Sequence, residues 1–355
     1  MIDGLTYEQH FWKDSRCHVL TVDLTKLRIG AAPAFPYFPM SNGFPVRPPQ
    51  LAREAGGVAS VGAGFPITLN HPLGITGQPF QLLVIEDEIW TTGVGRGGSV
   101  FLTMNGACWV QPATTSVRFW FEGKAIKIDE INLGHKGTVL FTPRGGTNAR
   151  PGPKRIHTIL SKKGEGQLVD GKWTQEWTVM PQKSDFRAGG LMKARYRVIE
   201  TDAPLPLEIG DVLKYQHDLG VPASDAVGGA TLMVQGGVNT VDRGDIFGGA
   251  SHGPDAWYIR KNPRTAIAAH VDPRLALLAV VEGRVSGSRG LRLKEFGNFL
   301  IEVGAHDAVN LDGGGSTHMW IRGEPNHGLV VDSCYGNGMI SGLRPNIYAT
   351  TVFPI

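Results

Sequence analysis

The run at residues 310–317, Asn-Leu-Asp-Gly-Gly-Gly-Ser-Thr, places one carboxylate beside three glycines and two hydroxyls. Three consecutive glycines remove all side chains from this stretch, so a ligand can approach closely and successive amide N–H groups can face an oxyanion. Asp312 would be held beside them, suited to stabilising positive charge or accepting a proton. The alternative is a tight hairpin turn capped by the aspartate.

Two further groups could act with this run. In the sequence NPRT at residues 262–265, Arg264 stands at the entrance of an apolar stretch, where a guanidinium could grip a phosphate or carboxylate bidentately. The sequence EGR at residues 282–284 closes the next apolar stretch, so Glu282 and Arg284 could lie near the glycine run. The alternatives are a surface arginine and a plain β-turn.

The elements that must position these residues are predicted by the surrounding pattern. Residues 266–270 and 275–281 are aliphatic stretches, and residues 293–303 repeat apolar side chains at helical spacing before Gly304. Residues 308–311 then form a short strand that runs into Asp312. This predicts a strand–helix–strand unit with a glycine-rich mouth, the kind of place where ligands are commonly held.

The rest of the chain predicts a mostly β protein. At 355 residues it is long enough for one large domain or two moderate ones, and its 48 glycines are spread among short apolar stretches, as expected for strands joined by tight turns. A helical turn is expected at 51–55. Strands are expected at 18–29, 57–61, 81–90 (a hairpin), 100–104, 116–121, 138–141, 204–218 and 230–235, with a connection at 225–229.

The segment 150–197 changes composition, because basic residues outnumber acids there and Trp173 and Trp177 lie between them. Such a segment could be an insertion or a lid that contacts an anionic or sugar ligand. The favoured interpretation is a solvated hairpin whose tryptophans pack inward, without a role in the chemistry.

Several classes of function are disfavoured. The net charge of +3 is too mild to indicate nucleic-acid binding, and no apolar stretch reaches the roughly 18 residues that a membrane helix needs. Gly93, Gly95 and Gly98 satisfy a GxGxxG pattern, but a strand rather than a helix follows, so no dinucleotide site is predicted. The histidines do not cluster at metal-ligand spacing, and we predict neither a metal nor a cofactor.

The order of motifs between residues 262 and 317 resembles the phosphodiester glycosidase family: NPRTAIA, an apolar stretch ending in EGR, an SRG turn, a helix and NLDGGGST. Weaker similarity extends over nearly the whole chain, including the final strand entrance at 344–346. The resemblance implies an α+β (mixed α/β) fold, here one domain over residues 1–355 with extensive mixed sheets and few helices. It also implies a glycosidase that cleaves a sugar 1-phosphodiester at the anomeric carbon.

Three positions depart from the family pattern. Gly62 stands where relatives tend to have an asparagine, and Glu282 stands where an aspartate is usual. His318 follows the glycine run where a small residue or threonine is usual, and it is either a new ligand contact or a strand residue facing solvent. These departures bear on the substrate more than on the scaffold.

The resemblance gives each site residue an expected role. Arg264 and the amides of residues 313–315 would hold the phosphate, while Asp312 or Glu282 would face the anomeric carbon. Further substrate contacts are expected from Asn310, Gly313, Gly314, Gly315, Ser316, Thr317, Thr265, Arg284, His318 and Asn346. Two alternatives remain: a glycosidase acting on a glycoside without phosphate, and a binding module for a sugar or sugar phosphate without catalysis.

The expected partner is thus a small glycoside or sugar-phosphate substrate, with no nucleic acid and no membrane span. Three cysteines leave at least one thiol unpaired, and residues 1–12 lack the pattern of a secretory signal. These features favour a cytoplasmic protein, with export and removal of a signal as the alternative.

Overall fold

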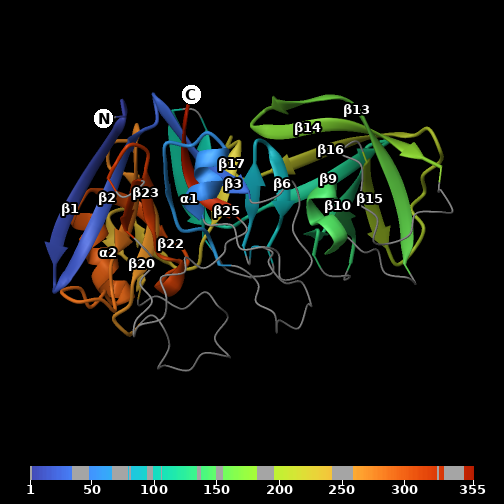
Figure 1. Cartoon of the computed structure of the whole chain (residues 1–355). Coiled ribbons are helices and arrows are strands. Elements are labelled where there is room, and N and C mark those ends of the chain that lie inside the picture. The colour runs from blue at the N-terminus through green and yellow to red at the C-terminus, as the bar shows by residue number, and fades with distance from the viewer. Residues whose placement is uncertain are drawn as a thin grey trace.

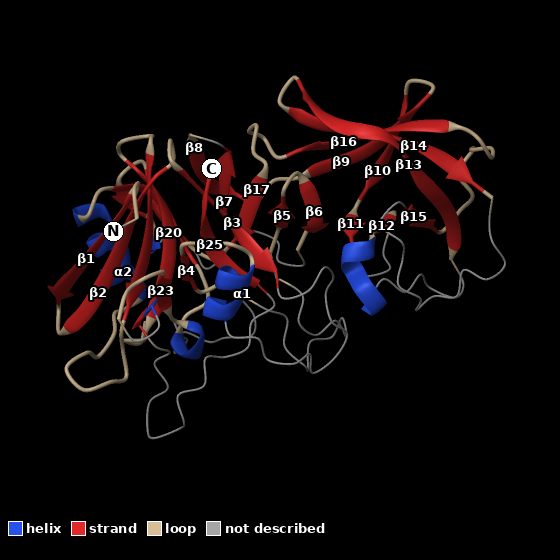
Figure 2. Ribbon diagram, turned by 45° about the horizontal axis from the view of Figure 1, so that its top comes forward, coloured by secondary structure: helices blue, strands red, loops and turns tan. Residues whose placement is uncertain are grey.

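The computed structural model describes residues 2–33, 48–65, 79, 81–93, 99–104, 106–133, 137–148, 155–181, 196–241, 259–325, 328–331 and 348–355. Within these ranges the protein is mostly β, with four sheets and two α-helices. A seven-stranded sheet with helix α2 lies at one end of an elongated molecule and an eight-stranded sheet at the other (Figures 1 and 2). Two five-stranded sheets belong to the part between them.

The seven-stranded sheet has the order β1-β2-β21-β20-β22-β18-β19 and carries the predicted site at its edge. All of its strand pairs are antiparallel. Its strands are β1 (Leu5–Trp12), β2 (Ser15–Asp23), β18 (Leu232–Gln235), β19 (Val238–Asn239), β20 (Arg264–His270), β21 (Leu275–Val281) and β22 (Ala305–Asn310).

The other three sheets complete the molecule. One five-stranded sheet, β24-β23-β4-β25-β3, contains β3 (Leu27–Pro33), β4 (Ala59–Val61), β23 (Met319–Ile321), β24 (Leu329–Val331) and β25 (Tyr348–Pro354). The other, β6-β5-β17-β7-β8, contains β5 (Leu83–Ile85), β6 (Glu88–Thr91), β7 (Ser99–Met104), β8 (Ala107–Pro112) and β17 (Asp225–Gly228). The eight-stranded sheet, β10-β9-β16-β14-β13-β15-β12-β11, contains β9 (Ser116–Phe121), β10 (Lys124–Ile128), β11 (Glu130–Ile131), β12 (Val139–Phe141), β13 (Ile156–Val169), β14 (Lys172–Met180), β15 (Tyr196–Thr201) and β16 (Val212–Asp218).

The seven-stranded sheet is buried on both faces. On one face, helix α2 (Leu293–Glu302) packs Phe296 and Phe299 against Ala266 and Leu277 of the sheet. On the other face, side chains such as Ile267 pack against the sheet that contains β4 and β23. Because successive strand residues point to opposite faces, the aliphatic runs predicted for these strands supply both cores.

The predicted strand–helix–strand unit is confirmed, with one refinement of its geometry. The helix predicted at 293–303 is α2, and the strand predicted at 308–311 is the end of the longer β22. Strands β21 and β22 are each antiparallel to β20, which lies between them. They therefore run parallel to each other, and their carboxyl ends reach the same edge of the sheet.

Two predictions about strands are wrong in detail. The strand expected at 18–29 is divided by a turn at 24–26, where the Asp23 carboxylate accepts the backbone N–H and the hydroxyl of Thr25 at 3.0 and 2.6 Å. The chain changes from one sheet to another there. The connection expected at 225–229 is instead strand β17, because the Asp225 side chain is buried beside Arg28, 3.6 Å away, rather than turned to solvent.

Other predicted elements agree with the structure in whole or in part. The short helix α1 (Pro48–Glu54) lies where a helical turn was predicted, and the hairpin at 81–90 is β5 and β6. Only the second half of 204–218 is a strand, β16. Among the described strand pairs only β11 and β12 are parallel, so the extensive mixing of strand directions that we expected is limited to that pair.

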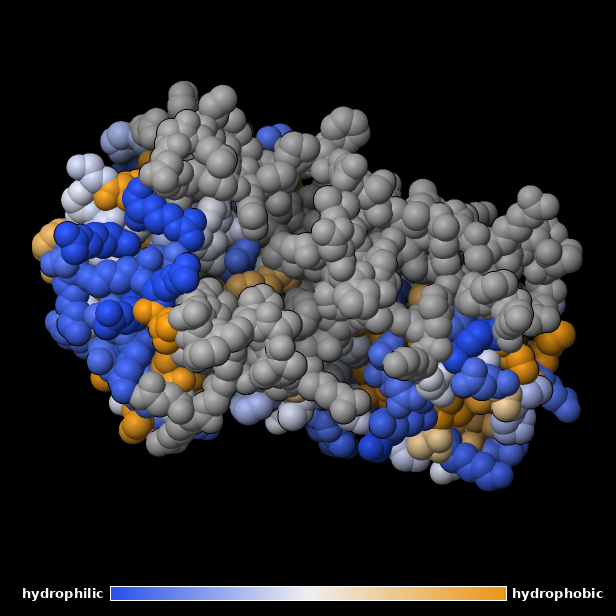
Figure 3. All heavy atoms as spheres, turned by 90° about the horizontal axis from the view of Figure 1, so that it is seen from below, coloured by the Kyte–Doolittle hydropathy of each residue, from blue (hydrophilic) through white to orange (hydrophobic). Residues whose placement is uncertain are grey.

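The described part of segment 150–197 consists mainly of the long strands β13 and β14, which lie inside the eight-stranded sheet. Trp177 is 5% exposed and Trp173 is half-buried. Seen from below, this end of the molecule shows hydrophobic side chains among hydrophilic ones, whereas the described surface at the opposite end is mostly hydrophilic (Figure 3). No helix among the described residues is long and apolar enough to cross a membrane.

Candidate active site

Asp312 lies two residues beyond the end of β22, just before the 3-10 turn η3 (Gly314–Ser316). Its backbone N–H donates to the Ala63 carbonyl at 3.0 Å, which ties the turn to the neighbouring sheet. One carboxylate oxygen accepts the Gly313 N–H at 2.9 Å, and the other accepts the Ser316 hydroxyl at 2.5 Å. Since Asp312 is only half-buried, these bonds produce a positioned carboxylate that solvent can still reach.

The glycine run does not present three free amides. The Gly313 N–H donates to Asp312, and the Gly314 N–H donates to the Pro263 carbonyl at 3.0 Å. The missing side chains serve close packing, because a Cβ atom on Gly313 would lie 2.7 Å from the Pro263 carbonyl oxygen. A phosphate would have to compete with these acceptors for the Gly313 and Gly314 amides, and phosphate binding by the three glycines stays a prediction.

The two arginines of the site differ in what they can do. Arg264 is 3% exposed, and its guanidinium donates to the carbonyls of Leu291 and Arg260 at 3.0 and 2.9 Å. Burial, and then the charge of Arg284, lower the pKa of Arg264 to about 9. The alternative of a surface arginine is thus wrong. Donors of the Arg264 guanidinium are already bonded to backbone carbonyls of the neighbouring loops.

Arg284 is the exposed cation of the site. Its guanidinium donates to the Asn262 side-chain carbonyl at 2.7 Å, and two of its nitrogens lie 3.6 and 3.7 Å from the position of a Cβ atom on Gly314. Gly314 has a φ of +60°, which glycine adopts without strain. A glycine turn without side chains therefore separates the Asp312 carboxylate from an exposed guanidinium.

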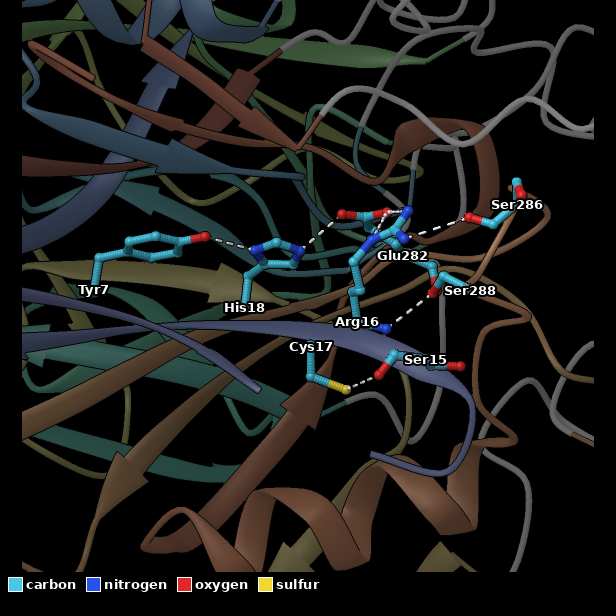
Figure 4. Close-up of polar contacts among 8 residues, drawn as sticks. All are labelled: Tyr7, Ser15, Arg16, Cys17, His18, Glu282, Ser286 and Ser288. Atoms are coloured by element: carbon cyan, nitrogen blue, oxygen red, sulfur yellow. Dashed lines mark hydrogen bonds and ion pairs between the residues drawn. The ribbon is translucent and has the colours of Figure 1, made fainter. Parts of the chain in front are cut away.

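Glu282 belongs to a hydrogen-bond network on β1 and β2 (Figure 4). One carboxylate oxygen contacts the His18 Nε2 at 2.9 Å, and the other accepts from the Arg16 Nε and Nη2 at 2.8 and 2.5 Å. The Tyr7 hydroxyl contacts the other ring nitrogen of His18 at 2.8 Å. Burial raises the pKa of Glu282, but the bonds and charges of His18 and Arg16 outweigh burial and lower that pKa to about 2.

Glu282 and Asp312 follow the carboxyl ends of parallel strands β21 and β22, so both lie at the same edge of the sheet. The two strands are separated by β20. Because neighbouring strands lie about 4.8 Å apart, the axes of β21 and β22 are about 10 Å apart. Each carboxylate has its own set of hydrogen-bond partners.

Four polar atoms of the predicted site are buried without a hydrogen-bond partner among the described residues: Thr265 Oγ1, Asn310 Oδ1, Thr317 Oγ1 and His318 Nε2. Buried polar atoms are normally paired, so a cluster of exceptions calls for an explanation such as a ligand. Thr265 and Asn310 do not share a face, however. Asn310 pairs with Ala266, whose side chain packs on α2, whereas Thr265 is the next residue along β20.

His318 is fully buried, so its alternative role as a solvent-facing strand residue is wrong. Its Nδ1 lies 3.3 Å from the Ser316 carbonyl oxygen. Burial lowers the pKa of His318 to about 4, only partly offset by that hydrogen bond, and the ring is therefore neutral at pH 7.

Gly62 lies directly against the Asp312 turn. A Cβ atom there would lie 3.0 Å from the Ser316 carbonyl oxygen and 3.4 Å from both the Asp312 carbonyl oxygen and the Thr265 hydroxyl. The Thr350 hydroxyl donates to the Gly62 carbonyl at 2.9 Å. Glycine at position 62, where relatives tend to have asparagine, thus leaves room for the turn at Asp312 to approach β4.

Sequence reasoning missed several neighbours of the site. Tyr348 is buried, its oxygen accepts the Gly64 N–H at 2.8 Å, and burial followed by the charge of Asp312 raises the pKa of its hydroxyl. Arg16 and His18 were missed because they lie some 270 residues before Glu282, and their alternating strand pattern gave no sign of their partner.

Asn346 lies outside the described residues, so its predicted contact with substrate stays a prediction. Within the described ranges, no three His, Cys, Asp or Glu side chains come together as metal ligands would.

Comparison with known families bears on this geometry. The family model of phosphodiester glycosidases matches residues 165–340, which include Arg264, Glu282, Arg284 and Asp312 and exclude Gly62. The family resemblance predicted from the motifs is therefore confirmed over this part of the chain. No curated protein matches the chain.

Solved structures share the fold. A crystal structure of a hypothetical protein from Synechocystis has a TM-score of 0.67 and 18% identity, covering 99% of this chain and 62% of that one. A crystal structure of a protein from Burkholderia pseudomallei, described there as an exported protein, has a TM-score of 0.66 and 18% identity. The match covers 96% of this chain and 74% of that one. The chain thus spans less than two thirds of the Synechocystis protein, and identities this low show the fold alone.

A weaker similarity is to the zebrafish N-acetylglucosamine-1-phosphodiester alpha-N-acetylglucosaminidase catalytic domain, auto-inhibited by its pro-peptide. It has a TM-score of 0.45 and 12% identity, covering 98% of this chain and 82% of that one. A TM-score this low supports no conclusion about the fold or the site.

Proposed function

We propose that this chain, which matches the phosphodiester glycosidase family over residues 165–340, is a glycosidase that cleaves a sugar 1-phosphodiester between the anomeric carbon and the phosphate oxygen. The family supports a hydrolase acting on a sugar-containing substrate. The specific bond and the roles of individual residues are our proposal.

The observation that carries the proposal is the arrangement around Gly314. The Asp312 carboxylate is fixed by Gly313 and Ser316 on one side, and the exposed Arg284 guanidinium lies over Gly314 on the other. A sugar phosphodiester needs these two charges when it breaks, because positive charge develops at the anomeric carbon and the phosphate departs as an anion.

In the proposed reaction, the bond between C1 and the phosphate oxygen breaks and the phosphate monoester leaves toward Arg284. Asp312 stabilises the oxocarbenium-like transition state and accepts a proton from the water whose oxygen bonds to C1. Arg264 acts as a positioning residue, because it holds the loop that carries Asn262, the partner of Arg284. A phosphate is a stable leaving anion, so no strong general acid is required.

A second candidate is a glycosidase acting on a glycoside without phosphate. It is favoured by the engagement of the Arg264 guanidinium and of the Gly313 and Gly314 amides inside the protein, which leaves fewer donors for a phosphate. In this candidate Asp312 has the same role, and Arg284 contacts sugar hydroxyls.

The test is sugar release by the purified chain from a panel of sugar 1-phosphodiesters and from nitrophenyl glycosides of the same sugars. Asp312→Asn keeps the shape of the turn but removes the charge, and we expect kcat to fall by about 100-fold or more. Arg284→Ala is expected to lower kcat/KM by about 10-fold or more for the phosphodiesters, since a charge-assisted contact contributes about 1.5–3 kcal/mol.

Arg289→Ala is the matched control, because Arg289 is another exposed arginine five residues along the chain. It should leave both substrates unaffected. Full activity of a folded Asp312→Asn variant would remove Asp312 from the mechanism. Release from the nitrophenyl glycosides alone would select the second candidate, and binding without release from any substrate would indicate a non-catalytic binding module.

A further inference from the structure

A cavity of about 310 Å³ is lined by the eight-stranded sheet and by the β5–β6 hairpin of a five-stranded sheet. The eight-stranded sheet is at the opposite end of the molecule from the seven-stranded sheet (Figure 1). Trp173, Gln175 and Trp177 alternate along β14, so all three face the cavity from one side of the sheet, and Tyr215 pairs with Gln175 on β16. Its volume is at the lower end of the range of small-molecule sites.

The fold makes room for Trp173 at the cavity. The pairing of β13 and β14 shifts register between Lys163 and Gln167, and Gly166 lies within this irregularity. A Cβ atom on Gly166 would lie 2.3 Å from the Trp173 ring, so this ring fits only because the residue is glycine. Trp173 thereby presents a large apolar ring that remains half-exposed at the cavity.

Trp177 has a hydrogen-bond donor that no described residue accepts. The residue is 5% exposed, and its indole Nε1 is buried without a partner among the described residues. The Arg197 guanidinium lies over its ring at 5.0 Å, which fixes the ring's plane. An indole N–H can only donate, so a ligand group that pairs with it would be an acceptor such as a hydroxyl oxygen.

The cations around the cavity already have acidic partners. Glu88 accepts from the Arg144 Nε at 2.7 Å and from the Arg197 Nη2 at 2.5 Å, and Lys162 contacts Glu165 at 2.7 Å. An anionic ligand would therefore have to compete with carboxylates for these groups.

Asp87 makes an anionic ligand less favourable still. Its half-buried carboxyl lines the cavity, and burial together with the nearby charges of Asp225 and Glu86 raises its pKa to about 6. A carboxylate in this position accepts hydrogen bonds from hydroxyl groups, which suits a neutral, hydroxyl-rich molecule.

We propose that this cavity is a second binding site, which holds one ring of a neutral saccharide. The apolar C–H face of the sugar packs on Trp173, a hydroxyl oxygen accepts from the Trp177 indole N–H, and hydroxyls donate to Asp87. The site belongs to a different sheet from Asp312 and binds without catalysing a reaction.

The test uses the full chain carrying Asp312→Asn, so that binding is measured without turnover. Isothermal titration with the methyl glycosides of glucose, galactose, mannose and N-acetylglucosamine should give saturable binding of at least one of them. Trp173→Ala is expected to weaken this binding at least 10-fold, and Trp177→Phe, which keeps a ring but removes the N–H, should weaken it several-fold. Asp87→Asn retains the left-handed backbone that Asp87 adopts at a φ of +63° and should also weaken binding.

Phe11→Ala is the control, because Phe11 is an aromatic residue, 71% exposed, on strand β1 of the other end. It should leave binding unchanged, and thermal melting verifies that each variant is folded. If Trp173→Ala does not fold, Trp177→Phe decides. The proposal is overturned if no methyl glycoside binds, if only glucuronic acid or glucose 1-phosphate binds, or if binding persists in both tryptophan variants. None of these outcomes depends on whether the chain is a glycosidase.

Discussion

At the scale of single residues, the candidate site depends on the side chains that hold Asp312 and on the absence of a side chain at Gly62. Asp312 is oriented by its own turn, through Gly313 and Ser316. The turn can reach β4 only because Gly62 has no side chain there. An alanine would place a methyl group 3.0 Å from the Ser316 carbonyl oxygen, which must then move together with the turn.

We therefore expect Gly62→Ala to lower kcat by about 10-fold while costing only about 1–3 kcal/mol of unfolding free energy, because small displacements of catalytic groups are costly. Steady-state kinetics and denaturant unfolding measure the two effects. Gly106→Ala is the matched control: its φ of +80° makes a side chain strained, but a Cβ atom there meets nothing within 4 Å. Equal kinetic effects of the two substitutions would contradict the role given to Gly62.

At the scale of elements, the topology of the seven-stranded sheet decides how far apart the two candidate carboxylates lie. Glu282 and Asp312 follow strands that run in the same direction on either side of β20. The axes of these strands are about 10 Å apart. Retaining glycosidases need their carboxylates about 5–5.5 Å apart, whereas inverting enzymes need about 6.5–9.5 Å.

The Glu282 carboxylate is bonded to Arg16 and His18 of β2, on the side of β21 away from β20, so it is not drawn toward Asp312. If both carboxylates act, we therefore expect release with inverted anomeric configuration. Proton NMR of the first-formed sugar, recorded before the anomers equilibrate, measures the outcome. If Glu282 acts with Asp312, Glu282→Gln should slow release under the same conditions, and Arg289→Ala should not. Release with retention would exclude Glu282 and Asp312 as a cooperating pair.

At the scale of the whole molecule, buried neutral histidines link stability to pH. His217 in the eight-stranded sheet and His318 beside the Asp312 turn both have a pKa lowered to about 4, chiefly by burial. Between pH 6.5 and 4 the unfolded chain binds protons at these residues that the folded chain does not bind, so stability falls as the pH falls.

We expect the two histidines to lower the free energy of unfolding between pH 6.5 and pH 4, each by an amount on the order of 3 kcal/mol at the lower limit. Asp87 partly offsets this loss, because its raised pKa of about 6 stabilises the folded chain as the pH falls. Below about pH 4.5, protonation of Glu282 in the unfolded chain adds to the loss, because the pKa of Glu282 in the folded chain is about 2. Denaturant unfolding at several pH values measures the slope. His217→Phe should flatten it, and a slope that is the same in both proteins would argue against this assignment.

The fold was predictable where local pattern and burial agree. The 2-residue alternation of strands and the helical spacing at 293–303 each follow from which side chains a single element buries, and the structure places strands and α2 there. The division of 18–29 was missed because its apolar pattern continues through the turn at Asp23 and Thr25. The strand at Asp225 was missed because a buried aspartate needs a distant arginine as its partner.

For the site, the sequence by itself determined the residue types and the glycine turn after Asp312, because these depend on neighbours along the chain. The common edge of β21 and β22 follows from their pairing with β20. Tertiary structure decided how each charged group is used. In the folded chain Arg264 donates to backbone carbonyls, and Glu282 pairs with Arg16 and His18. Arg284 remains exposed near Gly314. Tertiary structure also assembled the cavity at Trp173 from eight different strands and the turns next to them. Such pairings join residues far apart in sequence, and a hydrogen bond or an ion pair between them depends on a distance that only the folded chain sets.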